Sequence, residues 1–244
     1  MKGLIPAAGM GTRLHPVTLA IPKELLLVGD KAIIEYVIEA MKKVGIVDIT
    51  IVVGWKKHAI LDYLGSGKRL GVRITYVVQD ERDGLGKAVL AGQHVIGDES
   101  FLVVLGDDFF YPTSFLEDIL RKHESSDAVA TVGVAEVEDV SRHGIIKPGE
   151  GNVIVDMIEK PSVEDAPSKL GAMGVYVFDA GIFDAIRRTK PGHKGEIQLT
   201  DAISGFIREG KKVCFETISG HHIDVGTLED LKKANLFMSE VVES

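Results

Sequence analysis

A glycine-rich loop after a short apolar stretch is the first part of the chain whose residues suit chemistry. The loop covers residues 7–13 and contains Gly9, Gly11 and Arg13. Two glycines separated by one residue let backbone N–H groups approach a ligand, and successive N–H groups form a concavity that binds anions. The planar guanidinium of Arg13 matches the oxygens of a phosphate. The loop therefore favours phosphate binding, although a pair of glycines is also typical of a plain turn after a strand.

The spacing around this loop excludes two common phosphate-binding motifs. A P-loop needs Gly-Lys-Ser or Gly-Lys-Thr at a fixed distance from its first glycine, and a full dinucleotide fingerprint needs a third glycine. The chain has neither at the required positions. Lys23 follows Pro22 ten residues beyond Arg13, so residues 7–23 would supply two cations and several N–H donors. Taken alone, Lys23 would be interpreted as a solvated surface charge.

A pair of carboxylates follows another apolar run. Residues 101–105 are typical of a buried parallel strand, and Gly106, Asp107 and Asp108 come directly after it. Carboxylates at the end of such a strand lie in the crevice where α/β sheets bind ligands, and the glycine-rich loop would end at the same edge. Mg²⁺ binds through one or two carboxylates together with phosphate oxygens. The pair therefore indicates a magnesium site, with a solvated turn as the alternative.

The segment from His221 to Asp224 offers one more carboxylate. Asp224 precedes a helix that Thr227 can cap, so it is either a second metal ligand or part of a turn. The neighbouring His221 and His222 are of a type that binds zinc. The chain has no Cys and His cluster with metal-ligand spacing elsewhere, so the sequence favours magnesium over zinc.

Apolar runs alternate with segments of helical periodicity in the first half of the chain. The expected strands lie at 2–6, 49–53, 72–78 and 101–105, and the expected helices lie near 31–44, at 56–64 and at 84–95. Ser114 and Glu117 have the form of a capping box that opens another helix. Strand–helix alternation predicts an α/β fold with a mostly parallel sheet flanked by helices on both faces.

The second half contains more strands. They are expected at 128–137, 153–158, 171–178 and 212–218, with helices at 180–188, at 198–208 and from about 227. Residues 149–152 predict a hairpin turn. Because no linker divides the chain, we expect a single domain over residues 1–244.

The composition narrows the class of protein. The chain has 244 residues, of which 45% are hydrophobic and 26% charged, and its net charge is −8. This charge argues against a general nucleic-acid binder. The start of the chain does not resemble a signal peptide, and no window approaches the roughly 20 apolar residues of a membrane span. Its single cysteine, Cys214, is expected to be a small buried residue, and a chain without an intramolecular disulfide is typical of the cytoplasm.

Six motifs in order make the chain resemble the sugar-1-phosphate nucleotidylyltransferase family. They lie at residues 8–14, 22–26, 105–108, 159–161, 195–201 and 224–227. The chain is similar to glucose-1-phosphate thymidylyltransferases and UTP–glucose-1-phosphate uridylyltransferases over nearly its whole length. It ends soon after Phe237, so the resemblance is to the short form of the family, without the C-terminal extension of longer relatives.

The resemblance implies a fold and a site for each substrate. The fold would be Rossmann-like, of the glycosyltransferase-A type, with a nucleotide-binding half at about 1–130 and a sugar-phosphate-binding half at about 131–244. The nucleotide-binding residues would be Ala8, Gly9, Gly11, Thr12, Arg13, Gln79 and Gly84. The sugar-phosphate-binding residues would be Gly144, Glu159, Lys160, Gly174 and Glu196. The catalytic residues would be Arg13, Lys23 and Asp107, and the ligands of Mg²⁺ would be Asp107 and Asp224.

The implied reaction joins glucose 1-phosphate to UTP or dTTP, forms a nucleotide sugar and releases pyrophosphate. The implied partners are these two small molecules and possible further copies of the chain. The chain departs from many members of the family at three positions. His143 replaces an aromatic residue, His222 replaces Trp, and Asp108 replaces Asn. The identity of the base and of the sugar is therefore left open. The alternatives are a transferase that uses CTP or GTP with another phosphorylated acceptor, a metal-dependent glycosyltransferase, a non-catalytic nucleotide-sugar sensor and a nicotinamide oxidoreductase. The incomplete glycine fingerprint disfavours the oxidoreductase.

Overall fold

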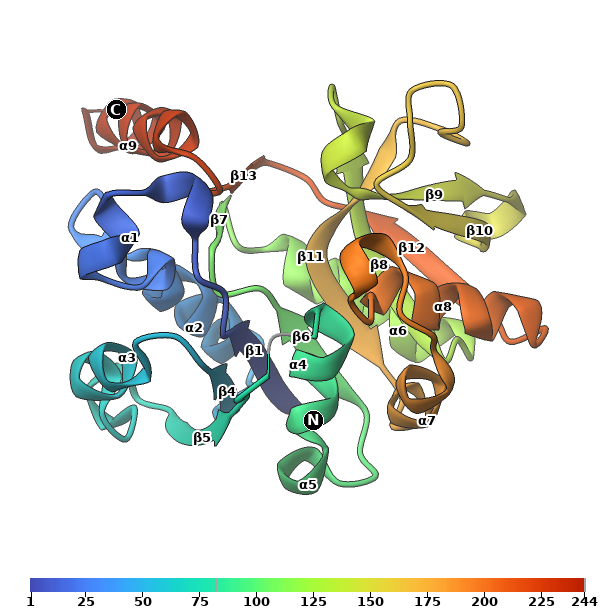
Figure 1. Cartoon of the computed structure of the whole chain (residues 1–244), viewed down its shortest axis with the longest axis horizontal. Coiled ribbons are helices and arrows are strands. Elements are labelled where there is room, and N and C mark those ends of the chain that lie inside the picture. Colours follow the sequence, from blue (N-terminus) through green and yellow to red (C-terminus); the bar gives the residue numbers. More distant parts are fainter. Residues whose placement is uncertain (82, 244) are drawn as a thin grey trace.

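The structure is a computed structural model that describes residues 1–81 and 83–243. These residues form a mixed sheet of nine strands. Its main strand order is β10-β9-β11-β6-β1-β4-β5, and β8 pairs with both β11 and β12 (Figure 1). Two two-stranded sheets, β13–β7 and β2–β3, accompany it. The main sheet is continuous from the first half of the chain into the second, which agrees with the expected single domain.

Parallel pairing organises the first half of the sheet. Its strands are β1 (Lys2–Ala7), β4 (Asp48–Val53), β5 (Arg73–Val78) and β6 (Phe101–Val104). β1 pairs in parallel with β4 and β6, and β4 pairs in parallel with β5. Successive side chains of a strand point to opposite faces, so Leu4 and Ile5 enter two different core clusters. The α/β sheet expected from the sequence is confirmed.

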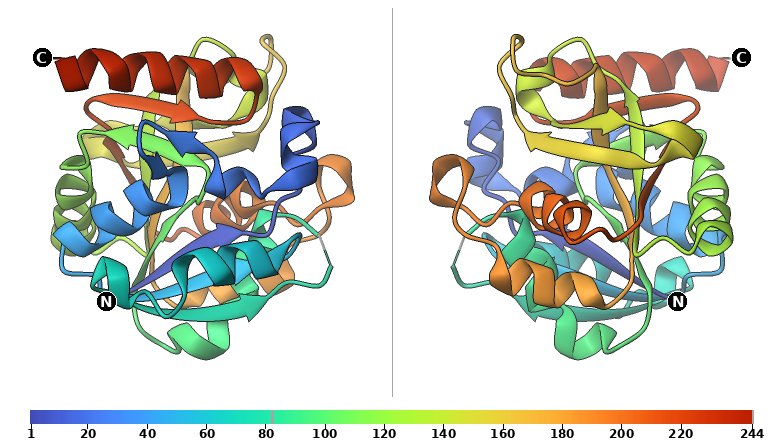
Figure 2. Two further views of the ribbon diagram at one scale, coloured as in Figure 1. Left: turned by 90° about the vertical axis from the view of Figure 1, so that its left-hand side faces the viewer. Right: turned by 90° about the vertical axis from the view of Figure 1, so that its right-hand side faces the viewer.

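Helices cover both faces of this sheet (Figure 2). The helices α2 (Ile33–Lys43), α3 (Lys57–Leu64) and α6 (Phe115–Ser126) pack in the cluster around Ile5. The helices α4 (Leu85–Ala91), α5 (Gln93–Ile96), α7 (Gly181–Arg188) and α8 (Leu199–Arg208) pack in the cluster around Leu4. The two layers hold the strand ends, and therefore the loops that follow them, in fixed positions.

Antiparallel strands extend the sheet in the second half. They are β8 (Ala130–Glu136), β9 (Gly144–Pro148), β10 (Ile154–Glu159), β11 (Leu170–Phe178) and β12 (Val213–Thr217), of which β12 runs parallel to β8. β11 pairs antiparallel with β6, β8 and β9, and so joins the two halves. The hairpin predicted at residues 149–152 connects β9 and β10. β9 itself was not predicted, because five residues that begin with Gly144 and end with Pro148 carry a weak strand signal.

The structure contains two short paired strands that the sequence analysis did not predict. They include or adjoin the predicted metal residues. β7 (Asp108–Tyr111) and β13 (His221–Asp224) are antiparallel, and Asp108 lies opposite Asp224. The sequence predicts no strand in either place, because four-residue strands with polar ends have no clear alternation. Only the pairing of segments more than a hundred residues apart makes them strands.

A third apolar cluster packs against the β7–β13 pair. It contains Phe109 of β7 and Val225, together with Ala234 of helix α9 (Leu228–Glu243). The hairpin of β2 (Leu27–Val28) and β3 (Lys31–Ala32) lies against α9. Thr227 caps α9 as expected, because the N–H of Asp230 donates to Thr227 Oγ1 at 3.2 Å.

Three details of the predicted elements are corrected. The helix expected near 31–44 begins only at Ile33, because Lys31 and Ala32 belong to β3. The helix expected at 84–95 divides into α4 and α5 at Gly92, which packs against Leu4. The capping box at Ser114 is wrong: α6 follows Ser114, but the Ser114 side chain forms no capping hydrogen bond.

Other expectations from composition agree with the structure. Cys214 is fully buried in β12, as expected. Within the described ranges, no helix combines the length and the apolar character that crossing a membrane requires.

A buried histidine joins α6 to the central sheet. His123 is 7% exposed, and its Nδ1 lies 3.0 Å from Thr131 Oγ1 of β8. Its Nε2 lies 3.5 Å from Asp179 Oδ1, and Ser100 also donates to that carboxylate. Burial lowers the pKa of His123, and Asp179 opposes the shift only in part.

We expect this histidine to make stability depend on pH. Because the folded-state pKa lies below the unfolded value of about 6.5, the unfolded chain binds more protons as the pH falls. Stability is therefore full above that value and decreases as the pH falls through it toward the folded-state pKa. A His123→Gln variant should show a shallower loss of melting temperature between about pH 7 and pH 5 than the unmodified chain. Equal slopes in thermal unfolding across that range would contradict the assignment.

Candidate active site

An ion pair between Lys23 and Asp107 lies at the carboxyl edge of the parallel strands. Lys23 opens a short 3-10 turn (Lys23–Leu25) after Pro22, and Asp107 follows β6. Burial alone would lower the pKa of Lys23, but the carboxylates of Asp107 and Glu24 outweigh it and raise the pKa above its ordinary value. The ammonium therefore stays charged beside Asp107.

The glycine-rich loop lies directly against this ammonium. A Cβ at Gly9 would lie only 3.5 Å from Lys23 Nζ, so the absence of a side chain leaves room for the cation. Gly11 has a φ of 63°, and the hydroxyl of Thr18 donates to its carbonyl at 2.7 Å. The left-handed conformation favours glycine at this turn. The sequence prediction that residues 7–23 form one cationic loop agrees with this geometry.

The exposed part of the loop faces the C-terminal segment. Gly9, Thr12 and Arg13 are exposed, whereas Ala8 is buried at the end of β1. A Cβ at Gly226 would lie 2.7 Å from Arg13 Nη2, so Arg13 lies directly beside the residues that follow Asp224. The first and last of the six motifs are therefore neighbours.

Three aspartates gather where β7 meets β13. Asp107 and Asp108 are 8% and 2% exposed, and Asp224 lies opposite Asp108 in the pair. The N–H of Val225 donates to the Asp107 carbonyl at 3.2 Å. His222 Nε2 lies 3.1 Å from Asp108 Oδ1. Burial raises the pKa of Asp108, and His222 opposes this shift.

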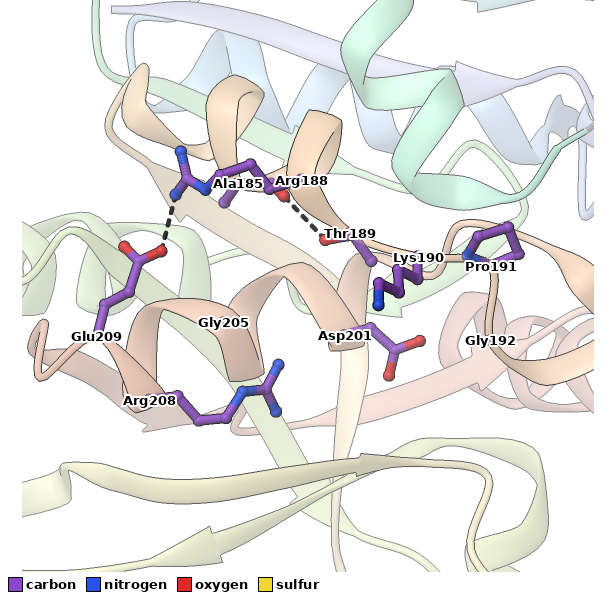
Figure 3. A pocket seen from close by; sticks show the side chains of 10 residues that line it. All are labelled: Ala185, Arg188, Thr189, Lys190, Pro191, Gly192, Asp201, Gly205, Arg208 and Glu209. Atoms are coloured by element: carbon purple, nitrogen blue, oxygen red, sulfur yellow. Dashed lines mark hydrogen bonds and ion pairs between the residues drawn. The ribbon is translucent and has the colours of Figure 1, made fainter.

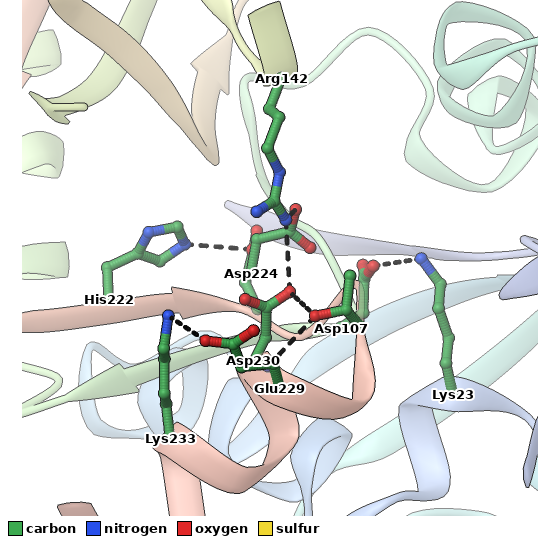
Figure 4. Close-up of polar contacts among 10 residues, drawn as sticks. Lys23, Asp107, Arg142, His222, Asp224, Glu229, Asp230 and Lys233 are labelled. Carbon is green, nitrogen blue, oxygen red and sulfur yellow. Dashed lines mark hydrogen bonds and ion pairs between the residues drawn. The ribbon is translucent and has the colours of Figure 1, made fainter. Parts of the chain in front are cut away.

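Arg142 is a site residue that the sequence interpretation missed (Figure 4). It ends a 3-10 turn (Val140–Arg142) between β8 and β9, and its Nη2 lies 3.6 Å from Asp224 Oδ2. Its distance to Asp230 Oδ2 is 3.3 Å. No motif signal marks this arginine, because its partners are more than eighty residues away in the sequence.

Glu24 is a second missed residue. It is 1% exposed, and neither side-chain oxygen has a hydrogen-bond partner among the described residues. Burial raises its pKa to about 8, although Lys23 acts in the opposite direction. A buried carboxyl next to the cationic loop could have been suspected from the run Lys23-Glu24, but its burial follows only from the packing.

The predicted sugar-phosphate residues form a second group on β9 and β10. Glu159 lies opposite Gly144 in this hairpin, and its Oε2 accepts from the hydroxyl of Thr200 at 2.6 Å. Lys160 Nζ lies 2.9 Å from Glu159 Oε1. A Cβ at Gly144 would lie 2.7 Å from Thr200 Oγ1, so the backbone passes close to this carboxylate. Lys160 has a φ of 45°, a conformation that costs free energy in a residue with a side chain and is often found at functional sites.

Gly174 and His143 connect the two groups. Gly174, with a φ of 67°, lies so close to Asp108 that a Cβ there would be 1.8 Å from Asp108 Oδ2. His143 precedes Gly144, and its pKa is lowered by burial while the charge of Asp224 opposes the shift. The structure therefore brings Gly174, one of the predicted sugar-phosphate residues, against Asp108, and His143 near Asp224.

Gln79 and Gly84 are the residues predicted to bind the base. Gln79 directly follows β5, and Gly84 directly precedes α4. A Cβ at Gly54 would lie 3.0 Å from the Ala8 carbonyl and 3.2 Å from the Gln79 carbonyl, so Gln79 is close to the loop. Gly84 has a φ of 104°, and a Cβ there would lie 2.6 Å from the Ile197 carbonyl.

Glu196 lies beside this part of the site. The same hypothetical Cβ of Gly84 would be 2.9 Å from Glu196 Cβ, and Gln198 Nε2 donates to Glu196 Oε2 at 3.1 Å. Glu196 is therefore a neighbour of a predicted nucleotide residue, and its sugar-binding role stays a prediction.

The donors present fit a magnesium ion. Within residues 1–81 and 83–243, no three His, Cys, Asp or Glu side chains are arranged to enclose a metal by themselves. Mg²⁺ does not need such a cage, since it is usually bound by one or two carboxylates, phosphate oxygens and water. Asp107 and Asp224 offer oxygens of this kind, and they are paired with Lys23 and Arg142 respectively.

One surface depression lies away from these residues (Figure 3). It has a volume of about 570 Å³ and lies between α7 and α8, lined by residues such as Arg188, Asp201 and Glu209. Arg188 is already paired with Glu209 at 2.8 Å. None of the predicted site residues lines it, so the charged edge described above is the better candidate site.

Comparison with known sequences identifies the family of the chain. A model of the nucleotidyl transferase family matches residues 2–241. The chain is 37% identical over 262 residues to a putative UTP–glucose-1-phosphate uridylyltransferase of Methanocaldococcus jannaschii, with 96% of this chain and 92% of that relative covered. It is 34% identical over 241 residues to the nucleotidyltransferase Agl11 of low-salt glycan biosynthesis in Haloferax volcanii. That match covers 98% of this chain but spans 66% of Agl11.

Solved structures give the same result. A UDP-glucose pyrophosphorylase complexed with UDP-glucose superposes with a TM-score of 0.91 at 35% identity, and 98% of each chain is covered. A putative glucose-1-phosphate thymidylyltransferase from Bacillus anthracis gives a TM-score of 0.85 at 31% identity, with 97% of this chain and 94% of the other covered. The family model, which matches residues 2–241, spans the glycine-rich loop, the aspartates and the hairpin of β9 and β10. The chain belongs to the nucleotidyl transferase family.

Proposed function

We propose that this chain is a glucose-1-phosphate nucleotidylyltransferase that uses UTP or dTTP and releases pyrophosphate. The observation that carries the proposal is the meeting of Arg13, Lys23, Asp107 and Asp224 at one sheet edge. This set suits a triphosphate with a divalent cation better than a nucleotide sugar alone, which disfavours a glycosyltransferase. The names of the matched relatives support glucose 1-phosphate and UTP or dTTP as substrates.

We assign the nucleotide to residues 1–130 and the sugar phosphate to residues 131–244. The N–H groups of the glycine-rich loop and Arg13 would bind the triphosphate, and Gln79 and Gly84 would contact the base. Glu159 would accept hydrogen bonds from sugar hydroxyls, and Lys160 would pair with the sugar phosphate. The proposal includes a cytoplasmic location, and assembly into a homo-oligomer stays a prediction.

The proposed reaction is an in-line displacement at the α-phosphorus. An oxygen of the sugar phosphate forms the new P–O bond, and the bond to the pyrophosphate breaks on the opposite side. The attacking phosphate is mostly ionised at neutral pH, because its second pKa is about 6, so no general base is needed. When bound, Mg²⁺ would neutralise charge on the phosphates.

The protein's own groups would act by position and charge. Lys23 would leave Asp107 and turn to the α-phosphate, where negative charge increases in the transition state. Arg13 would hold the leaving pyrophosphate. Lys160 would leave Glu159 for the sugar phosphate and align it for attack.

Pyrophosphate release tests the proposal. The assay would offer UTP, dTTP, CTP, GTP and ATP in turn with Mg²⁺, each with and without glucose 1-phosphate. We expect release only when both substrates are present, with UTP or dTTP the best donor. Release with CTP or GTP and a different acceptor would keep the reaction class and correct the substrates. The absence of release with every pair would reject the proposal.

We expect Lys23→Ala and Asp107→Ala to lower kcat by at least about 10²–10³-fold, because each removes a group that stabilises the transition state. Steady-state kinetics with saturating substrates measures this. Lys31→Ala is the matched control, since Lys31 pairs at 2.9 Å with Glu39, which is not one of the predicted site residues. A Lys23→Ala enzyme with unchanged kcat would remove Lys23 from the mechanism.

We expect Lys160→Ala to raise the KM for glucose 1-phosphate roughly tenfold or more while the KM for the nucleotide changes little, because a charge-assisted contact to the acceptor is lost. Lys147→Ala, an exposed lysine on the neighbouring strand β9, is the control. A change confined to the nucleotide KM would show that the two subsites are assigned the wrong way round.

A further inference from the structure

Arg142 links the predicted metal carboxylate to the start of the last helix. Its Nη2 lies between Asp224 Oδ2, at 3.6 Å, and Asp230 Oδ2, at 3.3 Å (Figure 4). The side chain is only 33% exposed, and its Nε has no hydrogen-bond partner within the described residues. One guanidinium nitrogen therefore serves two carboxylates that have different surroundings.

The turn that carries Arg142 is held in place independently of these carboxylates. Asp139 Oδ1 accepts from the N–H of Ser141 at 3.0 Å and from its hydroxyl at 2.6 Å. Asp139 thereby caps the 3-10 turn that ends at Arg142. The position of the Arg142 backbone is therefore fixed, and only its side chain can move between partners.

The two carboxylates differ in their fixed contacts. Asp230 accepts a hydrogen bond from the hydroxyl of Thr227 at 2.7 Å, and its N–H donates back to that hydroxyl, so it is fixed in the first turn of α9. Asp224 is the last residue of β13, and Arg142 is its ion-pair partner among the described residues. Its side chain is 27% exposed, so a cation from solvent can reach it.

We propose that Arg142 is a positioning residue that is shared between Asp224 and Asp230 in this structure, and that it gives up Asp224 and keeps Asp230 when a divalent cation binds. The proposal rests on the function proposed above, because it takes Asp107 and Asp224 as the metal ligands. Asp230 keeps the guanidinium paired after the exchange, so metal binding leaves no buried cation without a partner. Arg142 then sets how tightly the site holds the metal before the nucleotide arrives.

Removal of the arginine should tighten metal binding. A positive charge 3.6 Å from Asp224 both occupies the carboxylate and repels a divalent cation. We expect Arg142→Met, without nucleotide, to bind Mn²⁺ roughly three- to tenfold more tightly, the range of a partly screened charge pair. Free Mn²⁺ measured by electron paramagnetic resonance during a titration gives the affinity. Arg121→Met is the matched control, because Arg121 is an exposed arginine of α6 that pairs with Asp118, which is not a predicted site residue, and the Mn²⁺ affinity of this variant should not change.

Asp230→Asn tests the second half of the exchange. Asparagine keeps an oxygen for Thr227 but removes the charge that receives Arg142. The guanidinium then stays on Asp224, and we expect Mn²⁺ affinity to fall roughly two- to fivefold. In the double variant Arg142→Met/Asp230→Asn this loss should largely disappear, because residues that act through one partner are not additive.

The outcomes separate this inference from the proposed function. Asp224→Asn should weaken Mn²⁺ binding strongly, and if it does not, the metal site and the inference both fail. If Asp224→Asn weakens binding but Arg142→Met leaves the affinity unchanged or lower, the metal site stands and the role of Arg142 is wrong. An Asp230→Asn effect of equal size with and without Arg142 would show that Asp230 acts only through its own charge, which also overturns the exchange.

Discussion

The balance of charge around three neighbouring aspartates is the constraint on which the site depends. The pairing of β7 with β13 places Asp108 opposite Asp224, and Asp107 precedes β7 directly. Carboxylates this close repel one another unless cations or hydrogen-bond donors compensate them. The compensation comes from three separate parts of the chain: Lys23 after the glycine-rich loop, Arg142 from the turn before β9, and His222 from β13 itself. Segments that are far apart in the sequence therefore share the charge balance of this site.

Ion pairs in the site also hold cations that phosphate groups could bind. Lys23 is paired with Asp107, and Lys160 with Glu159, so each of these two lysines is paired with a carboxylate that we assign to a different ligand. Substrate binding would exchange one charged partner for another, which avoids the cost of bringing an unpaired cation out of water. Cations held in position in this way need little reorganisation during the reaction.

The sheet explains how residues from both halves reach one edge. The strands β1, β4, β5 and β6 are parallel, so their carboxyl ends lie at one edge of the sheet. The glycine-rich loop follows β1, Gln79 follows β5 and Asp107 follows β6. This is the edge where α/β sheets bind ligands. β11 then pairs with β6 and with the strands of the second half. Gly174 on β11 can lie against Asp108 only because it has no side chain and adopts a positive φ. A single glycine thus allows the sugar side of the sheet to meet the aspartates.

The sequence by itself determined the elements that have strong local signals. Apolar runs and helical periodicity predicted the parallel strands and the helices α2, α3, α7 and α8, because alternation and amphipathic spacing are local properties. The spacing of Gly9, Gly11, Arg13 and Lys23 predicted a cationic phosphate loop, and the resemblance supplied the family. Tertiary structure alone decided the strands β7, β9 and β13, the burial of Glu24 and the position of Arg142. These depend on contacts between residues far apart in the chain, and no local pattern encodes a partner that folding brings near.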